Sequence, residues 1–406
     1  MRVKIVLNAH AQSKGSTQML ETPTRTLKVR STTVPMGLGM RFSLRSLFVL
    51  ILIFGFASYQ KSDAKARNQP LQDICNRIQK TESLPALWLG YSRKADGSRP
   101  NIAAAGGLKI GDKASATPDN LVHIGSCTKA MTAVLIALLV EKGTLKWEQS
   151  IADSFPKLKD KIHPEYHDVT LEQLLQHRGK IPANASDWWI NKRQPVIERR
   201  LSIISANLLK EPPKVPKDGY RYSNLGYMIA GAMAEQATGR TWEKLLEEEL
   251  FKPLDITSAG FGAPGRTGRV DQPWGHTHDK NGNWQPKQGD NAAALGPAGT
   301  VHLSIADWIR FAEVFFPDSP QKLVSKETLL KLMTPASPNG YAMGWGTTRW
   351  NDDIIELRHS GSNTMWYATI VVDRKNQLTF VAVTNGHREG IEAVLEKAIE
   401  EVRALK

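Results

Sequence analysis

Strand-like segments lie near the two ends of the chain. Two apolar runs, 84–91 and 100–105, lie in its first third. Two more, 366–372 and 378–384, are separated by the turn-forming residues 373–376, which is typical of a hairpin. This distribution predicts a sheet that joins both ends of the chain.

Helical patterns fill the middle of the chain. The most apolar of them starts at Ser126 and ends at Lys142–Gly143, where glycine is a common stop. The other segments with helical spacing or capping signals are 71–82, a helix opened by Thr170–Gln173, 224–238, 241–252, 304–316 and 390–405. Residues 260–300 have the composition of a loop, with a hairpin signal at Asn281–Gly282.

These elements predict a protein of the α/β (α+β) class, an antiparallel sheet flanked by helices. We expect one domain over residues 71–406. Its α/β lobe would come from 71–125 and 295–406, and an inserted, mostly helical lobe from 126–294. Catalytic clefts often form between two such lobes.

The charge of the chain is concentrated in its first 70 residues. The net charge of +13 first suggests an anionic partner. However, 11 of the 53 Lys and Arg residues lie in residues 1–70 with only two acidic residues, which leaves 42 basic against 38 acidic residues in the rest. The predicted domain is therefore only mildly basic, and no nucleic-acid partner is expected.

The leader resembles an export signal. Arg41 and Arg45 precede the apolar run 47–57 (LFVLILIFGFA), which is short for a membrane span, and Ala64–Ala66 has the A-x-A form of a cleavage site. We expect an exported protein, periplasmic or extracellular, or one tethered to the membrane by this segment. Residues 1–39 fit no signal pattern, so we hypothesise that translation starts at Met40.

Ser126 and Lys129 bring a hydroxyl and an amine to the start of the most apolar helix. Positions i and i+3 share a helix face, so the two groups are neighbours. A serine hydroxyl needs an adjacent base to become a nucleophile, and a poorly solvated lysine has a lowered pKa. Alone, this spacing is weak evidence, because an N-cap serine beside a solvated lysine is far more common.

Two further segments support this chemistry. Tyr222 and Asn224 stand just before another apolar helix; beside an ammonium the phenolate of Tyr222 is favoured as a base, and Asn224 offers an amide to orient substrate and lysine. His359, Gly361 and Ser362 directly precede a predicted strand, whose edge could bind an extended substrate and offer backbone N–H groups to an oxyanion.

Together, Ser126-x-x-Lys129, Tyr222-x-Asn224 and His359-x-Gly361 resemble the three motifs of the penicillin-recognising serine hydrolases. The resemblance is to the branch that holds class C β-lactamases, DD-peptidases and related esterases. It covers roughly residues 72–404. Supporting stretches are Leu174–Gly179, Thr238–Gly239 followed by Pro253–Leu254, Pro297–Gly299, Leu303–Ser304 and Gly344–Gly346.

The resemblance implies a role for each residue. Ser126 would be the acylated nucleophile, and Lys129 and Tyr222 would share proton transfer, with Tyr222 activating the deacylating water. Asn224, His359 and Gly361 would lie in the substrate site. The N–H groups of Ser126 and Ser362 would form the oxyanion hole.

Departures from the family pattern affect the expected substrate. His359 stands where class C β-lactamases usually have lysine, and Arg178–Lys180 replaces the usual Thr-Ser-Gly. The resemblance therefore implies hydrolysis of an amide or ester through an acyl-enzyme. A true β-lactamase, a D-alanyl-D-alanine carboxypeptidase, a carboxylesterase and an inactive penicillin- or peptidoglycan-binding domain remain alternatives. The partner would be a small molecule or short peptide.

Neither a cofactor nor a metal is expected. Cys75 and Cys127 are too few for a disulfide framework or a structural zinc site. Residues 275–279 (GHTHD) have metal-like composition but lack a third partner at metal-ligand spacing.

Overall fold

The computed structural model describes residues 68–94, 99–217, 219–319, 321–336, 340–350 and 353–406. These belong to one compact unit that starts at Ala66. The predicted signal segment, cleavage site and start at Met40 lie outside the described residues. Within the described ranges, no helix combines the length and the apolarity that crossing a membrane requires.

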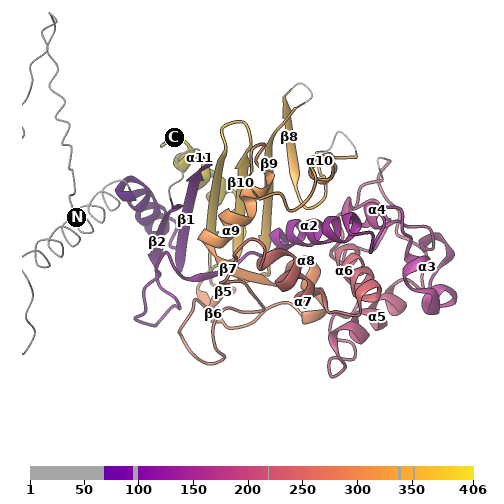
Figure 1. Ribbon diagram of the computed structural model, residues 1–406. Coiled ribbons are helices and arrows are strands. Elements are labelled where there is room, and N and C mark those ends of the chain that lie inside the picture. The colour runs from indigo at the N-terminus through magenta and orange to yellow at the C-terminus, as the bar shows by residue number, and fades with distance from the viewer. Residues whose placement is uncertain (1–67, 95–98, 218, 320, 337–339, 351–352) are drawn as a thin grey trace, which may run out of the picture. The chain divides into compact units, whose positions relative to one another are not determined.

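A large antiparallel sheet joins the two ends of the chain, as predicted (Figure 1). Within the described residues it has six strands in the order β2-β1-β11-β10-β9-β8. Their bounds are β1 Ala86–Arg93, β2 Asn101–Gly106, β8 Gly346–Trp350, β9 Asp353–Ser362, β10 Tyr367–Asp373 and β11 Leu378–Thr384. The first of these strands pairs with the last, Leu87 opposite Thr384.

Most of the short strands lie between 260 and 304, where the sequence predicted mainly loop. One small sheet has the order β3-β7-β4 and another pairs β5 with β6. Their bounds are β3 Leu121–His123, β4 Gly260–Phe261, β5 Gly275–His278, β6 Trp284–Lys287 and β7 Val301–Ser304. Strands of two to four residues carry too little alternation to be seen in the sequence. The Asn281–Gly282 turn does connect a hairpin, between β5 and β6.

Both faces of the large sheet are covered. Helical residues 68–81 and α11 (Ile391–Arg403) pack on one face, against Leu87, Leu89 and Phe380. The opposite face, which carries Trp88 and Ile370, contributes to the larger core together with the middle helices. Strands β1 and β11 are therefore apolar along nearly their whole length, as burial on two faces requires.

The middle of the chain is helical. Its helices are α2 Thr128–Glu141, α3 Ile151–Ser154, α4 Leu171–Leu175, α5 Val196–Asn207, α6 Asn224–Thr238, α7 Trp242–Leu246, α8 Gly296–Gly299, α9 Ile305–Ala312 and α10 Lys326–Met333. Short segments of tighter helix are η2 Gly125–Cys127, η3 Pro156–Lys161, η4 Pro164–Tyr166, η6 Ala293–Leu295 and η7 Glu313–Phe315, and Glu247–Phe251 (η5) is a π-helical turn.

Helix α2 connects the sheet with the helical part. In Figure 1 it extends from the sheet toward α4 and α6. Twelve of its residues, Thr128 to Leu139, are buried, which explains why its sequence is apolar all round. The helix was predicted to start at Ser126, but residues 125–127 form the separate turn η2, and α2 begins at Thr128.

Candidate active site

Ser126 and Lys129 are neighbours at the junction of η2 and α2. The Nζ atom of Lys129 lies 3.1 Å from the Oγ atom of Ser126. Ser126 is partly exposed, whereas the Lys129 side chain is fully buried. The pair therefore combines an accessible hydroxyl with an amine that water does not reach.

Lys129 has two further polar neighbours. Its Nζ atom donates to Oδ1 of Asn224, the first residue of α6, and to the backbone oxygen of Ala298 in α8, both at 2.7 Å. Burial without a carboxylate partner lowers the pKa of Lys129 to about 7. A neutral amine has two N–H groups and one lone pair. The oxygens of Asn224 and Ala298 can accept the two N–H groups, and the hydroxyl of Ser126 can donate to the lone pair. The uncharged amine can therefore accept the proton of Ser126.

Tyr222 lies on the other side of Ser126, in the segment that leads into α6. Ser223 caps that helix by accepting from the N–H of Gly226, which fixes the chain next to Tyr222. The phenol hydroxyl contacts Ser126, and the Tyr222 ring centroid is 4.9 Å from Lys129 Nζ. Burial raises the pKa of Tyr222 well above its usual value. The expected phenolate is thus wrong, because desolvation of the anion outweighs the hydrogen bond with Ser126, which acts in the opposite direction.

His359 is enclosed in the same way. It is buried on β9, and burial, with a smaller contribution from Lys129, lowers its pKa to about 3. Its Nε2 atom is 3.5 Å from the hydroxyl of Tyr341, and its Nδ1 atom has no hydrogen-bond partner among the described residues. Burial is thus the larger cause of the neutrality of His359, and the charge of Lys129 is the smaller one.

Rings from distant segments surround this site, and the sequence assigned Tyr222 but not the other rings to it. His177 packs against Tyr222, Tyr227 and Tyr341, with ring centroids 4.3, 5.1 and 4.7 Å apart. Its Nδ1 atom accepts from the N–H of Ser223. His177 lies in the Leu174–Gly179 stretch, so the family resemblance was the only signal available for it. These rings keep water from Lys129.

The backbone of η2 lies directly against the end of β9. A Cβ atom placed on Gly361 would be 2.6 Å from the nitrogen of Ser126, and one on Gly125 would be 2.5 Å from the nitrogen of Ser362. Strand β8 pairs with β9 only as far as Arg358, so no strand among the described residues pairs with residues 359–362 on that side. The structure thus brings together the two N–H groups that were predicted to form an oxyanion hole.

A cavity of about 430 Å³ opens at Ser126. Its lining residues come from the helical part, from the segment before α8 and from the end of β9: Ser126, Asn184, Trp188, Trp189, Asn224, Asp290, Asn291, Ala292, Leu295, Ala298, Gly299, Ser362, Asn363, Thr364 and Met365. Lysine, arginine and histidine are absent from this described lining, and Asp290 is its one charged member. His359, predicted as a substrate-site residue, does not line it.

The family model for the β-lactamases, described as "Beta-lactamase", matches residues 95–404. The chain belongs to the β-lactamase family. This membership identifies it as a serine hydrolase in general terms and agrees with the antiparallel sheet and inserted helices described above.

The proteins that are similar to this β-lactamase-family chain carry several different names. Protein flp of Staphylococcus aureus (strain N315) is 24% identical over 302 residues, 71% of this chain and 57% of that protein. The chain thus spans little more than half the length of this relative. Penicillin-binding protein 4 of Amycolatopsis lactamdurans is 25% identical over 299 residues, 70% of this chain and 77% of that protein. The D-amino acid amidase of Ochrobactrum anthropi SV3 has a similar fold, with a TM-score of 0.66 and 20% identity. The match covers 84% of this chain and 99% of the amidase chain.

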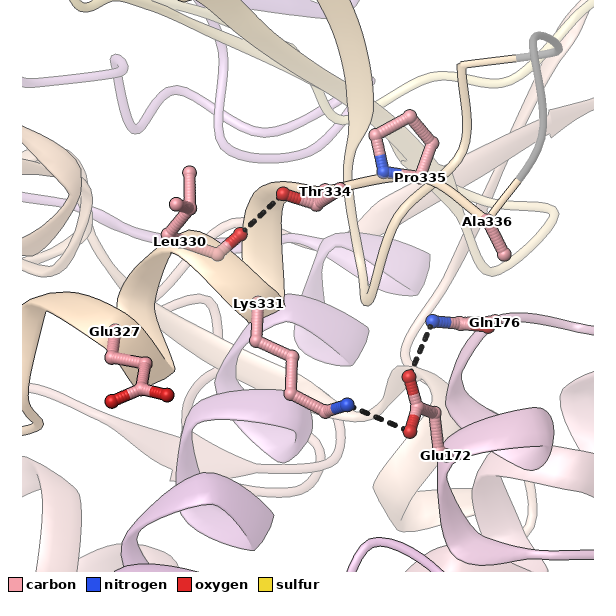
Figure 2. Close-up of a pocket in the computed structure, with 8 residues that line it drawn as sticks. All are labelled: Glu172, Gln176, Glu327, Leu330, Lys331, Thr334, Pro335 and Ala336. Carbon is pink, nitrogen blue, oxygen red and sulfur yellow. Dashed lines mark hydrogen bonds and ion pairs between the residues drawn. The ribbon is translucent and has the colours of Figure 1, made fainter.

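Outside this cavity, other polar side chains of the β-lactamase-family chain that could suggest a site are paired with neighbouring residues. A pocket of about 390 Å³ lies between α4 and α10 (Figure 2), and its Lys331 is paired with Glu172 at 2.8 Å. In the 275–279 stretch, His276 accepts from the N–H of Ile110. The described residues contain no cluster of His, Cys, Asp or Glu suited to a metal. Both cysteines are buried, and burial raises the pKa of Cys127.

Proposed function

We propose that the chain hydrolyses an amide or ester bond through an acyl-enzyme on Ser126. The observation that carries this proposal is the contact of the Ser126 hydroxyl, at 3.1 Å, with a lysine whose pKa is about 7. Close to half of such lysines are uncharged at neutral pH. A nucleophile and a base in hydrogen-bond contact at the floor of a cavity are the minimum that covalent acyl transfer requires.

In acylation, the Ser126 oxygen attacks the carbonyl carbon of the substrate while its proton passes to Lys129. The carbonyl π electrons move to the oxygen, which becomes an oxyanion between the N–H groups of Ser126 and Ser362. Collapse of this intermediate breaks the bond to the leaving amine or alcohol. The proton taken from Ser126 then reaches the leaving group, directly from Lys129 or through the hydroxyl of Tyr222.

In deacylation, a water molecule attacks the ester formed on Ser126. The phenol of Tyr222 takes a proton from this water and at the same time gives its own proton to Lys129. Tyr222 therefore remains neutral. The raised pKa of Tyr222 favours this relay over a preformed phenolate. Departure of the acid returns a proton to Ser126.

The cavity favours substrates that are not anionic. A carboxylate next to the reacting bond would find no cationic side chain in the described lining, and would face Asp290. Trp188 and Trp189 offer an aromatic wall for an apolar acyl or leaving group. We therefore place amides and esters without a carboxylate ahead of penicillins, and treat amino acid amides, suggested by the name of the amidase with the same fold, as the first candidates.

The deciding experiment measures turnover on p-nitrophenyl esters, amino acid amides, D-Ala-D-Ala peptides and nitrocefin, together with labelling by a fluorophosphonate. We expect Ser126→Ala to lose turnover by several orders of magnitude and to lose labelling. Ser150→Ala removes another N-terminal serine, the cap of α3, and serves as the matched control. Equal labelling of wild type and Ser126→Ala would refute the assignment. Labelling without turnover on any substrate would favour a ligand-binding domain.

We also propose that the protein is exported, on the grounds of the basic and apolar leader. Fractionation of the native host, with mass spectrometry of the N-terminus, tests this. A mature protein in the cytoplasm that retains residues 47–57 would contradict it.

A further inference from the structure

Three buried polar side chains form a row beside the catalytic serine that the mechanism above does not use. They are His123 at the end of β3, Asp290 before η6, and Asn363 directly after β9. The Nε2 atom of His123 lies 2.9 Å from Oδ1 of Asp290, and Nδ2 of Asn363 donates to the same oxygen at 2.8 Å. The side chains of His123 and Asp290 are only 0% and 6% exposed.

The residue at each end of this row forms hydrogen bonds with backbone N–H groups close to Ser126 or Ser362. The N–H of Gly125 donates to Nδ1 of His123 at 3.1 Å, immediately before Ser126. At the other end, Oδ1 of Asn363 accepts from the N–H groups of Met365 and Trp366 at 3.2 and 3.1 Å, which fixes the turn after Ser362. The row therefore connects the two segments whose N–H groups would bind the oxyanion.

The hydrogen bond from Gly125 also determines the tautomer of His123. Because Nδ1 accepts, the ring proton is on Nε2, on the side of Asp290. The N–H at Nε2 is not aligned with the carboxylate oxygen of Asp290. The contact between them is therefore an electrostatic attraction and not a well-formed hydrogen bond. The second oxygen of Asp290 is buried with no hydrogen-bond partner among the described residues. An unpaired buried carboxylate oxygen is costly, and stability alone does not account for it.

We propose that His123, Asp290 and Asn363 are positioning residues that set the separation of the Ser126 and Ser362 N–H groups. The two segments come from opposite ends of the domain and meet through Gly125 and Gly361, which have no side chains to hold them in register. An oxyanion hole works only when both donors lie about 2.7 to 3.1 Å from the oxygen. The row of His123, Asp290 and Asn363 links the two segments and supplies that constraint. This inference rests on the proposed acyl transfer at Ser126.

The test compares an ester with its thionoester in wild type and Asp290→Ala, which removes the oxygen that both His123 and Asn363 contact. Sulfur is larger than oxygen and a weaker acceptor, so a thionoester gains little from an oxyanion hole. Asp290→Ala is expected to lower kcat for the ester by about 10- to 100-fold, because the link between the two donor segments is broken. KM should change little, and the ester-to-thionoester rate ratio should fall about tenfold.

Asp307→Ala is the matched control. Asp307 is also a buried aspartate, and it accepts from the N–H groups of Thr257 and Ser258 and from the Ser258 hydroxyl. Its loss should destabilise the fold comparably while leaving the ratio unchanged. If Asp290→Ala does not fold, His123→Asn replaces it, because the shorter side chain loses contact with Asp290.

An unchanged ratio in a folded Asp290→Ala or His123→Asn variant would overturn the inference while leaving the proposed function intact. A rise in KM confined to substrates with a free amino group would also overturn it, since Asp290 would then bind the substrate's charge. Absence of turnover in the wild type on every substrate would overturn the proposed function, and the inference with it.

Discussion

At the scale of single residues, the buried amine of Lys129 predicts how the rate depends on pH. With a pKa of about 7, the lysine is protonated in acid and cannot accept the proton of Ser126. We expect kcat/KM for a neutral ester to rise with pH and to level off above about pH 8. His359, with a pKa of about 3, remains neutral throughout this range and adds no second limb. A rising limb centred above pH 9 would show that Lys129 is not the base.

Tyr222→Phe should slow deacylation more than acylation. The ring and its packing against His177 are retained, and only the hydroxyl that relays the proton is lost. Loss of general-base assistance typically costs about 10²- to 10⁴-fold. A p-nitrophenyl ester should then give a rapid burst of one equivalent followed by slow turnover. Tyr220→Phe, in the same segment, should turn over normally, and the same result for Tyr222→Phe would exclude the relay.

The residues of the site were predictable to different degrees. Ser126 and Lys129 could be proposed from their spacing, because the helix between them fixes their geometry. The role of Ala298 could not, since a backbone oxygen leaves no trace in the sequence. Tyr341 and His177 were missed because they reach the ring of Tyr222 from separate segments. The pKa of Tyr222 was predicted in the wrong direction because burial was not visible from neighbours in sequence.

At the scale of elements, the contact between η2 and β9 depends on glycine. A Cβ atom on Gly361 would be 2.2 Å from the oxygen of Ile124 and 2.6 Å from the nitrogen of Ser126, both backbone atoms that cannot turn aside. We expect Gly361→Ala to reduce kcat/KM by about 10²-fold or more, as removal of an oxyanion donor does. Gly289→Ala is the control, because its Cβ would meet only Met365 at 3.8 Å. Similar rates for both variants would show that the contact tolerates a side chain.

The elements with strong local signals were predicted well. Helix α6 begins at Asn224 and ends at Thr238, as its apolar spacing and the following Gly239 indicated, and β11 spans the predicted 378–384. The segment 241–252 differs: it divides into α7 and a π-helical turn. A change in helical pitch depends on how side chains pack, so periodicity alone did not reveal it.

At the scale of the whole molecule, one buried arginine connects several helices. Arg200 on α5 pairs with Glu235 of α6 and with Glu243 of α7, the latter at 2.7 Å, and donates to Ala293 and Ala294 of η6. Burial raises the pKa of Glu235 even beside this guanidinium, which shows how costly its desolvation is.

Arg200→Met should lower the free energy of unfolding by about 3 to 5 kcal/mol, because it leaves Glu235 buried without its counter-charge. Denaturant unfolding measures this. Arg240→Met, which breaks a partly exposed pair with Glu249, should have a much smaller effect. The double variant Arg200→Met/Glu235→Met should recover part of the loss. Equal stability of Arg200→Met and wild type would show that the helices do not depend on this group.

The pairing of β1 with β11 has a consequence for biosynthesis. The hydroxyl of Thr384 donates to the backbone oxygen of Ala86, 298 residues earlier in the chain. At about 5 to 20 residues per second, a ribosome adds that span in roughly 15 to 60 s. Throughout this time β1 exposes an unpaired edge and two apolar faces to other chains. Because an unpaired edge and apolar faces promote aggregation, we expect a chaperone to bind a nascent chain arrested before residue 378 more strongly than the full-length chain.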